Sequence, residues 1–136
     1  NGYNVLEETV ACGKTAIANM LVDSNADLAH QGPNGETVLI IASIRGNMAL
    51  VCRFIDKGVS LKHADIYGST ALHYAAFSGV KSVVEALVDG GANVLAVSND
   101  GYDAEMVAVC HGNVDIARYL GEKVRCRLDE IRSGIY

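Results

Sequence analysis

The feature that most constrains this chain is a pattern of glycines that recurs every 33 residues. Gly35, Gly68 and Gly101 keep this spacing, and so do Gly46, Gly79 and Gly112. A short apolar segment lies between the two glycines of each copy. Periods of roughly 20–50 residues are typical of stacked repeats, in which each unit buries its apolar face against the next one. The period therefore predicts an elongated array with an extended surface, and surfaces of this kind bind other macromolecules.

The third copy indicates what one unit looks like. Thr70 can cap the N-terminus of a short helix, and Gly79 is expected to end that helix. A second helix with an apolar stripe is expected over residues 80–89, and Gly91 can then adopt the left-handed conformation that closes a helix. Asp100-Gly101 predicts a tight turn before the next copy. Each unit is therefore expected to consist of a helix, a turn, a second helix and a loop.

The other copies keep these physical properties while the residues change. The expected caps of the first helices are Asn4, Thr37, Thr70 and Asp103, and the expected ends of the second helices are Asn25, Gly58 and Gly91. Asn, Thr and Asp are good N-caps, and Asn and Gly tolerate the left-handed conformation best. We therefore expect one repeat domain over residues 1–121, with repeats at about 1–32, 33–65, 66–98 and 99–121, and a C-terminal capping helix or tail over 122–136.

The residues of the third copy resemble the ankyrin repeat family. Thr70-Ala71-Leu72-His73-Tyr74-Ala75-Ala76, followed by Gly79 and by Gly91-Ala92-Asn93, carries the resemblance, which covers about residues 2–121. The resemblance implies an all-α repeat solenoid of about four helix-turn-helix repeats. It also implies β-hairpin-like finger loops at about a right angle to the helices, with tips at Asn34-Gly35, Tyr67-Gly68 and Asp100-Gly101, and a helical cap at the C-terminus.

The fourth copy departs from the family pattern at its first helix. Asp103-Ala104-Glu105-Met106 replaces the family's Thr-Pro-Leu-His, so that Glu105 stands where a core leucine belongs. An unpaired carboxylate is costly to bury. We therefore expect this helix to lie near the solvated end of the stack, with Met106 or Val109 filling part of the space.

The composition narrows the classes of partner and compartment. The net charge of −5 argues against a general nucleic-acid binder, which would carry a basic face. No apolar run approaches the roughly 20 residues that a membrane helix needs, so we expect no membrane insertion. The four cysteines, Cys12, Cys52, Cys110 and Cys126, contain no C-x-x-C pair, which gives zinc binding little support. We expect reduced thiols, a cytoplasmic or nuclear protein, and no metal or cofactor.

Basic residues gather only near the C-terminus. Lys123, Arg125, Arg127 and Arg132 lie there, with Glu122, Asp129 and Glu130 among them. Because the two signs of charge alternate, we interpret this segment as the solvated face of a helix.

Two short motifs suggest nucleotide binding or catalysis, and their surroundings support neither. Gly13-Lys14-Thr15 looks like the end of a phosphate-binding loop, but that motif needs a glycine where Glu8 stands. Cys110 and His111 cannot pair directly as nucleophile and base, because adjacent residues of a helix point in different directions. His73 occupies the structural histidine position of the ankyrin family, which implies hydrogen bonding to nearby backbone. We therefore expect no enzyme activity and no catalytic residue.

The leading hypothesis is a non-catalytic module that binds a peptide or domain of another protein. The resemblance implies that the partner lies along the finger loops and the concave face of the first helices. The expected partner-binding residues are Glu36, Ile41, Ile44, Arg45, Ile66, Tyr67, Tyr74, Phe77, Tyr102, Val107 and His111, and Tyr3 and Glu8 fall on equivalent positions. Exposed apolar patches and tyrosine anchors are typical of interaction sites, so we expect a peptide segment with apolar anchors.

Several alternatives stay open at this point. The chain could be a targeting or inhibitory segment of a larger enzyme or enzyme complex, or it could be a structural spacer. An apolar strip could also pair with a second copy of the chain. The exposure of Tyr67, Tyr74 and Phe77 separates a binding module from a spacer, because values near zero would mean that these rings only pack between repeats.

Overall fold

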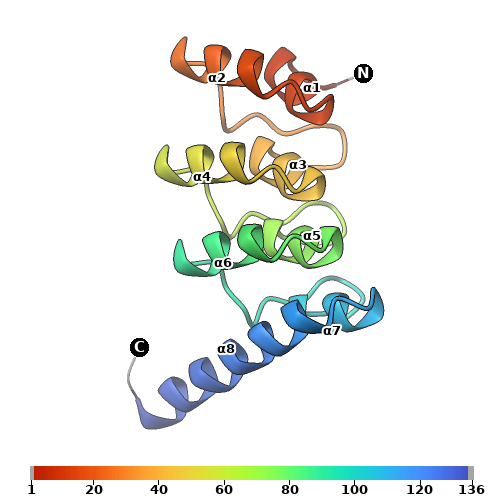
Figure 1. The fold of residues 1–136 in the computed structure, drawn as a ribbon, viewed down its shortest axis with the longest axis vertical. Helices are drawn as coiled ribbons and strands as arrows, with labels where there is room; N and C mark the ends of the chain where they lie inside the picture. Colours follow the sequence, from red (N-terminus) through yellow and green to blue (C-terminus); the bar gives the residue numbers. More distant parts are fainter. Residues whose placement is uncertain (1, 135–136) are drawn as a thin grey trace.

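The computed structural model describes residues 2–134, so residue 1 of the expected first repeat and residues 135–136 of the expected tail lie outside the described part. Within residues 2–134 there are eight helices and no strand. In chain order the helices are α1 (Val5–Ala11), α2 (Thr15–Asp23), α3 (Val38–Arg45), α4 (Met48–Asp56), α5 (Ala71–Ser78), α6 (Lys81–Asp89), α7 (Ala104–Cys110) and α8 (Val114–Ser133). Successive helices form pairs that stack one on another (Figure 1), which confirms the stacked array that the glycine period predicts. The described part of the chain is an all-α repeat solenoid, as the resemblance implies.

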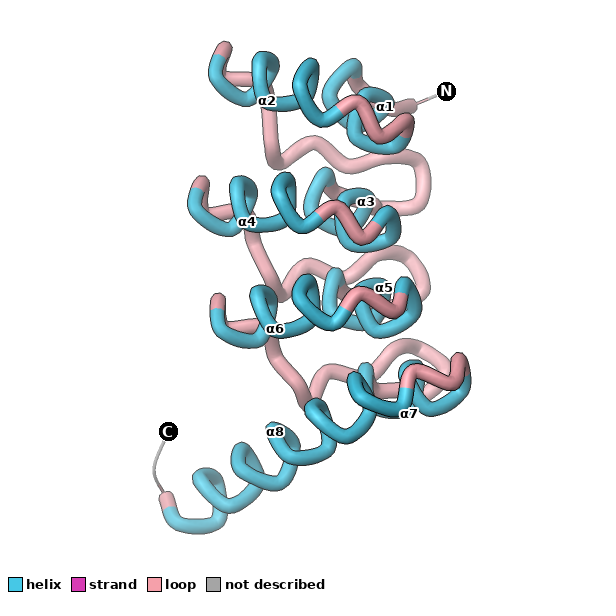
Figure 2. Tube along the Cα trace, in the orientation of Figure 1, coloured by secondary structure: helices cyan, strands magenta, loops and turns pink. Residues whose placement is uncertain are grey.

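The stack has two columns of helices. The odd-numbered helices α1, α3, α5 and α7 form one column, and α2, α4, α6 and α8 form the other (Figure 2). Each helix packs against its partner in the pair and against the same column of the neighbouring pair. The loops after α2, α4 and α6 return across the stack to the next odd-numbered helix (Figure 2). The core is therefore a continuous apolar layer between the columns, and each repeat depends on its neighbours.

The predicted N-caps begin the first helix of every pair. Asn4 precedes α1, Thr37 precedes α3, Thr70 precedes α5 and Asp103 precedes α7. The side-chain oxygens of Asn4, Thr37 and Asp103 accept the backbone N–H of Glu7, Ile40 and Met106 at 2.8, 3.4 and 2.8 Å. These bonds satisfy N–H groups that have no partner inside the helix, which confirms the capping role.

His73 performs the capping at α5 and also joins two repeats. Its Nδ1 accepts the N–H of Thr70 at 3.1 Å. In a neutral imidazole the other nitrogen then carries the proton, so Nε2–H donates to the carbonyl of Tyr102 at 2.9 Å. His73 is buried. The expected structural role of this histidine is therefore confirmed.

The predicted ends of the second helices all adopt the left-handed conformation. Asn25 has a φ of 62°, Gly58 of 82° and Gly91 of 105°, and Asn25 is the only non-glycine residue with positive φ in the described part of the chain. A Cβ placed on Gly58 or Gly91 would meet no atom within 4 Å. The backbone conformation, and not crowding, therefore requires glycine at these positions.

The core of the fourth pair differs from the expectation. Met106 and Val109 are 47% and 63% exposed, so the prediction that one of them fills the space of the missing leucine is wrong. Ala104 and Ala108 are buried instead, because they lie on the face of α7 that packs in the stack. Glu105 is half-buried and lies against Gly121 of α8, where a Cβ would come within 2.3 Å of its Oε2 atom.

The last helix, α8, is one continuous element of 20 residues. The expected boundary between the fourth repeat and the tail, at 121/122, therefore falls inside a helix. The first half of α8 buries Ile116 and Leu120, and the second half extends beyond the even-numbered column (Figure 1). Gly134, with a φ of 77°, ends it.

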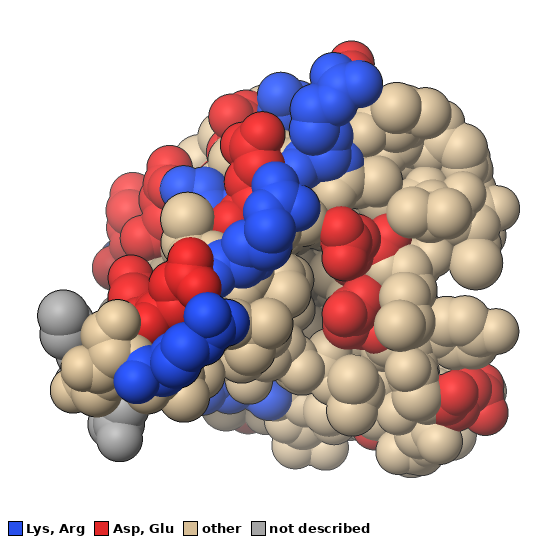
Figure 3. Space-filling view, turned by 90° about the horizontal axis from the view of Figure 1, so that it is seen from below, with Lys and Arg blue, Asp and Glu red and all other residues tan. Residues whose placement is uncertain are grey.

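Charged side chains of both signs cover the exposed face of α8. Lys and Arg form a ridge along this end of the molecule, and Asp and Glu lie beside it (Figure 3). Arg118 pairs with Asp115 at 3.9 Å, Arg127 with Glu130 at 3.2 Å, and Arg132 with Asp129 at 3.5 Å. These pairs lie within the helix and on its surface, as a solvated face does. None of the helices in residues 2–134 combines the length and the apolar character needed to cross a membrane.

Candidate partner-binding surface

The long loops fold back at their tips through equivalent backbone hydrogen bonds. In the first loop the N–H of Gly32 donates to the carbonyl of Glu36 at 2.8 Å, and the N–H of Gly35 donates to the carbonyl of Gly32 at 3.0 Å. The same arrangement joins Asp65 to Ser69 and Ser98 to Tyr102. The tip glycines Gly35, Gly68 and Gly101 have φ values of 81°, 74° and 85°, which L-residues with a Cβ rarely adopt. The turns at the loop tips therefore require glycine at these three positions, which lie 33 residues apart.

Neighbouring loop tips are also hydrogen-bonded to each other. The N–H of Ile66 donates to the carbonyl of Asn34, and the N–H of Asn99 donates to the carbonyl of Tyr67, both at 2.9 Å. The side chain of Asn99 donates a further bond to the carbonyl of Ile66 at 3.0 Å. The tips therefore form a row whose members hold fixed positions relative to one another.

The predicted site residues divide into an exposed and a recessed group. Ile66, Tyr67, Phe77 and Tyr102 are 58%, 55%, 50% and 47% exposed, and Ile44, Arg45 and His111 are also exposed. Glu36, Tyr74 and Val107 are half-buried. Ile41 is buried, with 7% of its surface exposed. The recessed residues include one from the same position of each of α3, α5 and α7, namely Ile41, Tyr74 and Val107. Ile44 and Phe77 lie one turn further along α3 and α5 and are more exposed.

Phe77 and His111 form a ring pair across two repeats. Their ring centroids lie 4.6 Å apart with an interplanar angle of 87°, which is an edge-to-face geometry. Nδ1 of His111 lies 2.9 Å from the carbonyl oxygen of Val107 and donates to it as the Nδ1–H tautomer. α5 and α7 thus present one joined patch, in which half of the Phe77 side chain still faces solvent.

Tyr74 is tied to the second loop by a carboxylate that sequence reasoning missed. Its hydroxyl donates to Asp65, whose other oxygen accepts the N–H groups of Tyr67 at 2.9 Å and Ser69 at 3.0 Å. Burial, the hydrogen bond and the charge of Asp65 raise the pKa of Tyr74. The signal that could have revealed Asp65 is its place at the start of a turn, where Asp commonly bonds its own backbone.

A groove lies at the first end of the surface, between α1 and α3. It has a volume of about 230 Å³ and is lined by Tyr3, Glu7, Glu8, Ala11, Glu36, Ile41, Ile44 and Arg45. Four of the predicted site residues, Glu36, Ile41, Ile44 and Arg45, therefore meet in one cavity. Glu7 was not predicted, because a carboxyl one turn into a helix reads as part of the cap.

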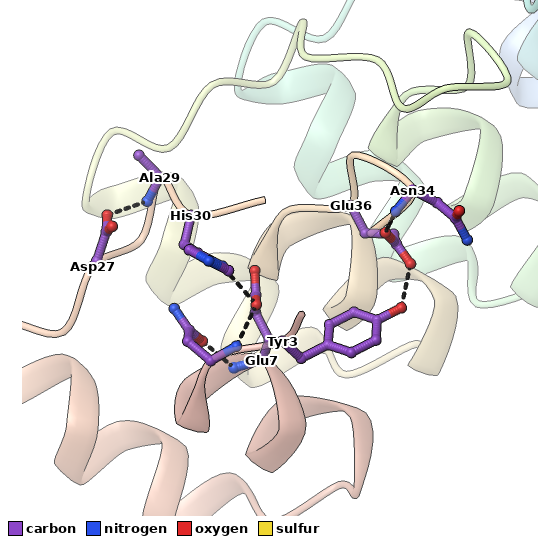
Figure 4. Close-up of polar contacts among 8 residues, drawn as sticks. Tyr3, Glu7, Asp27, Ala29, His30, Asn34 and Glu36 are labelled. Atoms are coloured by element: carbon purple, nitrogen blue, oxygen red, sulfur yellow. Dashed lines mark hydrogen bonds and ion pairs between the residues drawn. The ribbon is translucent and has the colours of Figure 1, made fainter. Parts of the chain in front are cut away.

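Glu7 is the most buried polar group of this groove. It is 0% exposed, and its Oε1 atom accepts the N–H of Asn4 at 2.8 Å and lies 2.9 Å from Nδ1 of His30 (Figure 4). The Oε2 atom is buried and has no hydrogen-bond partner among the described residues. Buried polar atoms normally have a partner, so this oxygen marks a place where one more donor would be favourable.

Tyr3 and Glu36 form the wall of the groove on the side of the loop tips. The Tyr3 hydroxyl donates to Oε2 of Glu36, and Oε1 of Glu36 accepts the N–H of Asn34 at 2.8 Å (Figure 4). Burial raises the pKa of Glu36, but the hydrogen bonds from Tyr3 and from the backbone outweigh it and lower that pKa below its ordinary value. The hydrogen bond to Glu36, together with burial, raises the pKa of Tyr3. Glu36 is therefore held as a carboxylate near neutral pH.

Comparison with known proteins assigns most of this architecture to one family. A family model described as "Ankyrin repeats (3 copies)" matches residues 6–98 and, in an overlapping second match, residues 62–130. The two matches together include all eight helices, apart from the first residue of α1 and the end of α8. A comparison with curated proteins gave no significant match.

Proposed function

Because the chain belongs to the ankyrin repeat family, we propose that it holds a peptide segment of a partner protein along its loop tips and odd-numbered helices. Ankyrin repeats are generally protein–protein interaction modules, and the family is typically non-catalytic. The specific proposal concerns the place and the manner of binding, namely a strip that runs from Ile44 past Tyr67 and Phe77 to Tyr102.

One observation carries this proposal. Four large apolar or aromatic side chains keep about half of their surface in solvent: Ile66, Tyr67, Phe77 and Tyr102. None of them belongs to the buried core between the columns. Aromatic side chains bury a large area with few rotatable bonds, and Tyr and Trp are enriched among residues that dominate binding energies. Large apolar side chains that the fold does not use are therefore available to a partner.

The rigidity of the strip also favours binding. The loop tips are hydrogen-bonded in a row, and Tyr74 and His73 fix the tips to α5. A surface that is already ordered loses little conformational entropy when a partner docks. A structural spacer would have no need for half-exposed rings at Tyr67 and Phe77, so their exposure supports a binding module over a spacer.

A peptide-display experiment tests this function. Peptides selected from a random phage-displayed library on the purified protein provide the probe, and their affinities are measured by fluorescence anisotropy. The variant Tyr67→Ala/Phe77→Ala is expected to weaken binding by about tenfold or more, because each ring is a candidate hot spot.

The matched control removes exposed apolar side chains from the other column. Ile17→Ala/Met20→Ala truncates two exposed residues of α2 and is expected to leave the affinity unchanged. Selection of no binding peptide, or peptides that are sensitive to the α2 variant and not to the strip variant, would contradict the proposed function. Circular dichroism of both variants checks that they keep their helices.

A further inference from the structure

The groove between α1 and α3 differs in size and chemistry from the rest of the strip. Its volume of about 230 Å³ is below the roughly 300–1,000 Å³ of pockets that hold drug-sized ligands. A cavity of this size suits a single side chain of a bound peptide. Its walls combine apolar side chains, from Ala11, Ile41 and Ile44, with carboxyl groups.

The charges of the groove are unequal and separated. Glu7 and Glu8 lie in the first turn of α1, and Glu36 lies just before α3, so three carboxyl groups gather at the end near the loop tips. Arg45, the one basic residue that lines the groove in the described part of the chain, lies in the last turn of α3. Its Nη2 atom is 3.4 Å from where a Cβ on Gly13 would stand, so the guanidinium is directed to the turn between α1 and α2. The groove therefore has an acidic end, an apolar middle and a distant positive end.

Glu7 adds an independent indication of what the acidic end would bind. Its buried Oε2 atom lacks a hydrogen-bond partner among the described residues, and Glu7 lines the groove. Leaving such an oxygen unpaired costs free energy that a donor in the groove would recover. The apolar walls of the groove lower the effective dielectric constant, which strengthens the attraction between a carboxylate and a positive charge.

We propose that this groove holds an arginine or lysine side chain of the bound peptide. The aliphatic stem of that side chain packs on Ile41 and Ile44, and its charged head faces the carboxyl groups of Glu7, Glu8 and Glu36. Long basic side chains have this dual character, with an apolar stem and a cationic tip. The inference rests on the proposed function, since it assigns the chemistry of one position of the peptide in the same strip.

An apolar side chain is the main competing occupant. Leucine or phenylalanine would match Ala11, Ile41 and Ile44, but it would desolvate the carboxyl groups without supplying a donor. An acidic side chain would be repelled at the end near the loop tips. The charge balance of the lining therefore favours a cation over both.

The test uses a phage-selected peptide and a matched analogue. The basic residue of the selected peptide is replaced by norleucine, which keeps a four-carbon aliphatic stem and removes the charge. We expect the affinity to fall by about tenfold or more, as it does when one partner of a close charge pair is removed. Each other position of the peptide is also replaced in turn. An equal loss of affinity at every position would not be specific to this groove.

A double-mutant cycle tests whether the cation lies in the groove. Glu36→Gln keeps the shape of the side chain, and Glu85→Gln on α6 is the control variant that removes the same charge elsewhere. We expect Glu36→Gln to weaken the original peptide severalfold and to have little effect on the norleucine peptide, while Glu85→Gln affects neither. Glu7→Gln provides a second variant of the same groove. Its thermal unfolding is measured to check that it folds.

The outcomes separate this inference from the function on which it rests. Selected peptides without a basic residue, or effects of Glu36→Gln and norleucine that simply add, would overturn the inference. If those peptides are still weakened by Tyr67→Ala/Phe77→Ala, the proposed function stands without it. If no peptide binds, both are overturned.

Discussion

His73 of α5 and Tyr102 of the following loop are joined by a hydrogen bond of 2.9 Å, from Nε2 of the imidazole to the backbone carbonyl. The same ring also accepts the N–H of Thr70 through Nδ1. One buried side chain thus caps its own helix and fixes the position of the next loop. His63 has a related contact to the previous loop, since its Nε2 atom lies 2.7 Å from the carbonyl oxygen of Gly35.

We expect His73→Ala to lower the free energy of unfolding by about 2 kcal/mol, because it removes the acceptor of the Thr70 N–H and the hydrogen bond that joins α5 to the carbonyl of Tyr102. Urea denaturation followed by circular dichroism measures this change. The control variant is Lys57→Ala, at the exposed end of α4. His30→Ala is less suitable as a control, because His30 contacts Glu7. A loss below about 0.5 kcal/mol for His73→Ala would mean that these bonds contribute little.

The caps and helix ends could be predicted from the sequence because their physics is local. Asn4, Thr37 and Asp103 bond to residues within the same turn, and Gly58 and Gly91 are required by their own backbone conformation. A 33-residue period then shows that these local signals recur in register. Fold class and repeat number follow from such signals without knowledge of any distant contact.

Features that depend on distant contacts could not be predicted in the same way. Met106 and Val109 are exposed because the orientation of α7 is set by its packing in the stack, which no residue of α7 reveals. The fourth repeat is expected to end at Gly121, but α8 continues through it, and the side chain of Glu105 from α7 occupies the space where a Cβ of residue 121 would stand. The contact of Glu7 with His30 and the hydrogen bond from Tyr74 to Asp65 join segments that are apart in the chain, so these two contacts emerge only from the fold.

Two tip glycines that look alike in sequence are expected to respond differently to alanine. At Gly101 a Cβ meets no atom within 4 Å, so Gly101→Ala should cost only the strain of the left-handed conformation, about 1–2 kcal/mol. At Gly68 a Cβ would stand 2.8 Å from the backbone nitrogen of Asn99, so Gly68→Ala should cost more. Thermal unfolding of both variants measures the difference. Equal losses would show that the tips are not packed against each other as described.

The raised pKa of Tyr74 predicts a loss of stability in alkaline solution. Burial is the main cause, followed by the hydrogen bond to Asp65, and the ordinary pKa is 10.0. The folded chain therefore keeps this proton at pH values where the unfolded chain has lost it. The contribution of Tyr74 to stability is full below pH 10 and declines as the pH rises above 10 towards the folded pKa.

Tyr74→Phe tests this alkaline effect. The variant is expected to lose about 1 kcal/mol at neutral pH, because the hydroxyl bond to Asp65 disappears, and to show a shallower decline in stability above pH 10 than the wild type. Tyr67→Phe at the exposed loop tip is the control. The pKa values of Tyr3 and Tyr119 are also raised, so the stability of the variant is compared with that of the wild type at each pH. Parallel curves of stability against pH would contradict the assignment to Tyr74.

The measurement that tests the binding account most directly is a nuclear magnetic resonance titration of the isotope-labelled protein with a phage-selected peptide. The account predicts that backbone amide signals of the loop tips and of α3, α5 and α7 shift, with the largest changes around Tyr67, Phe77 and the α1–α3 groove. Shifts confined to α2, α4 and α6, or to the second half of α8, would contradict it.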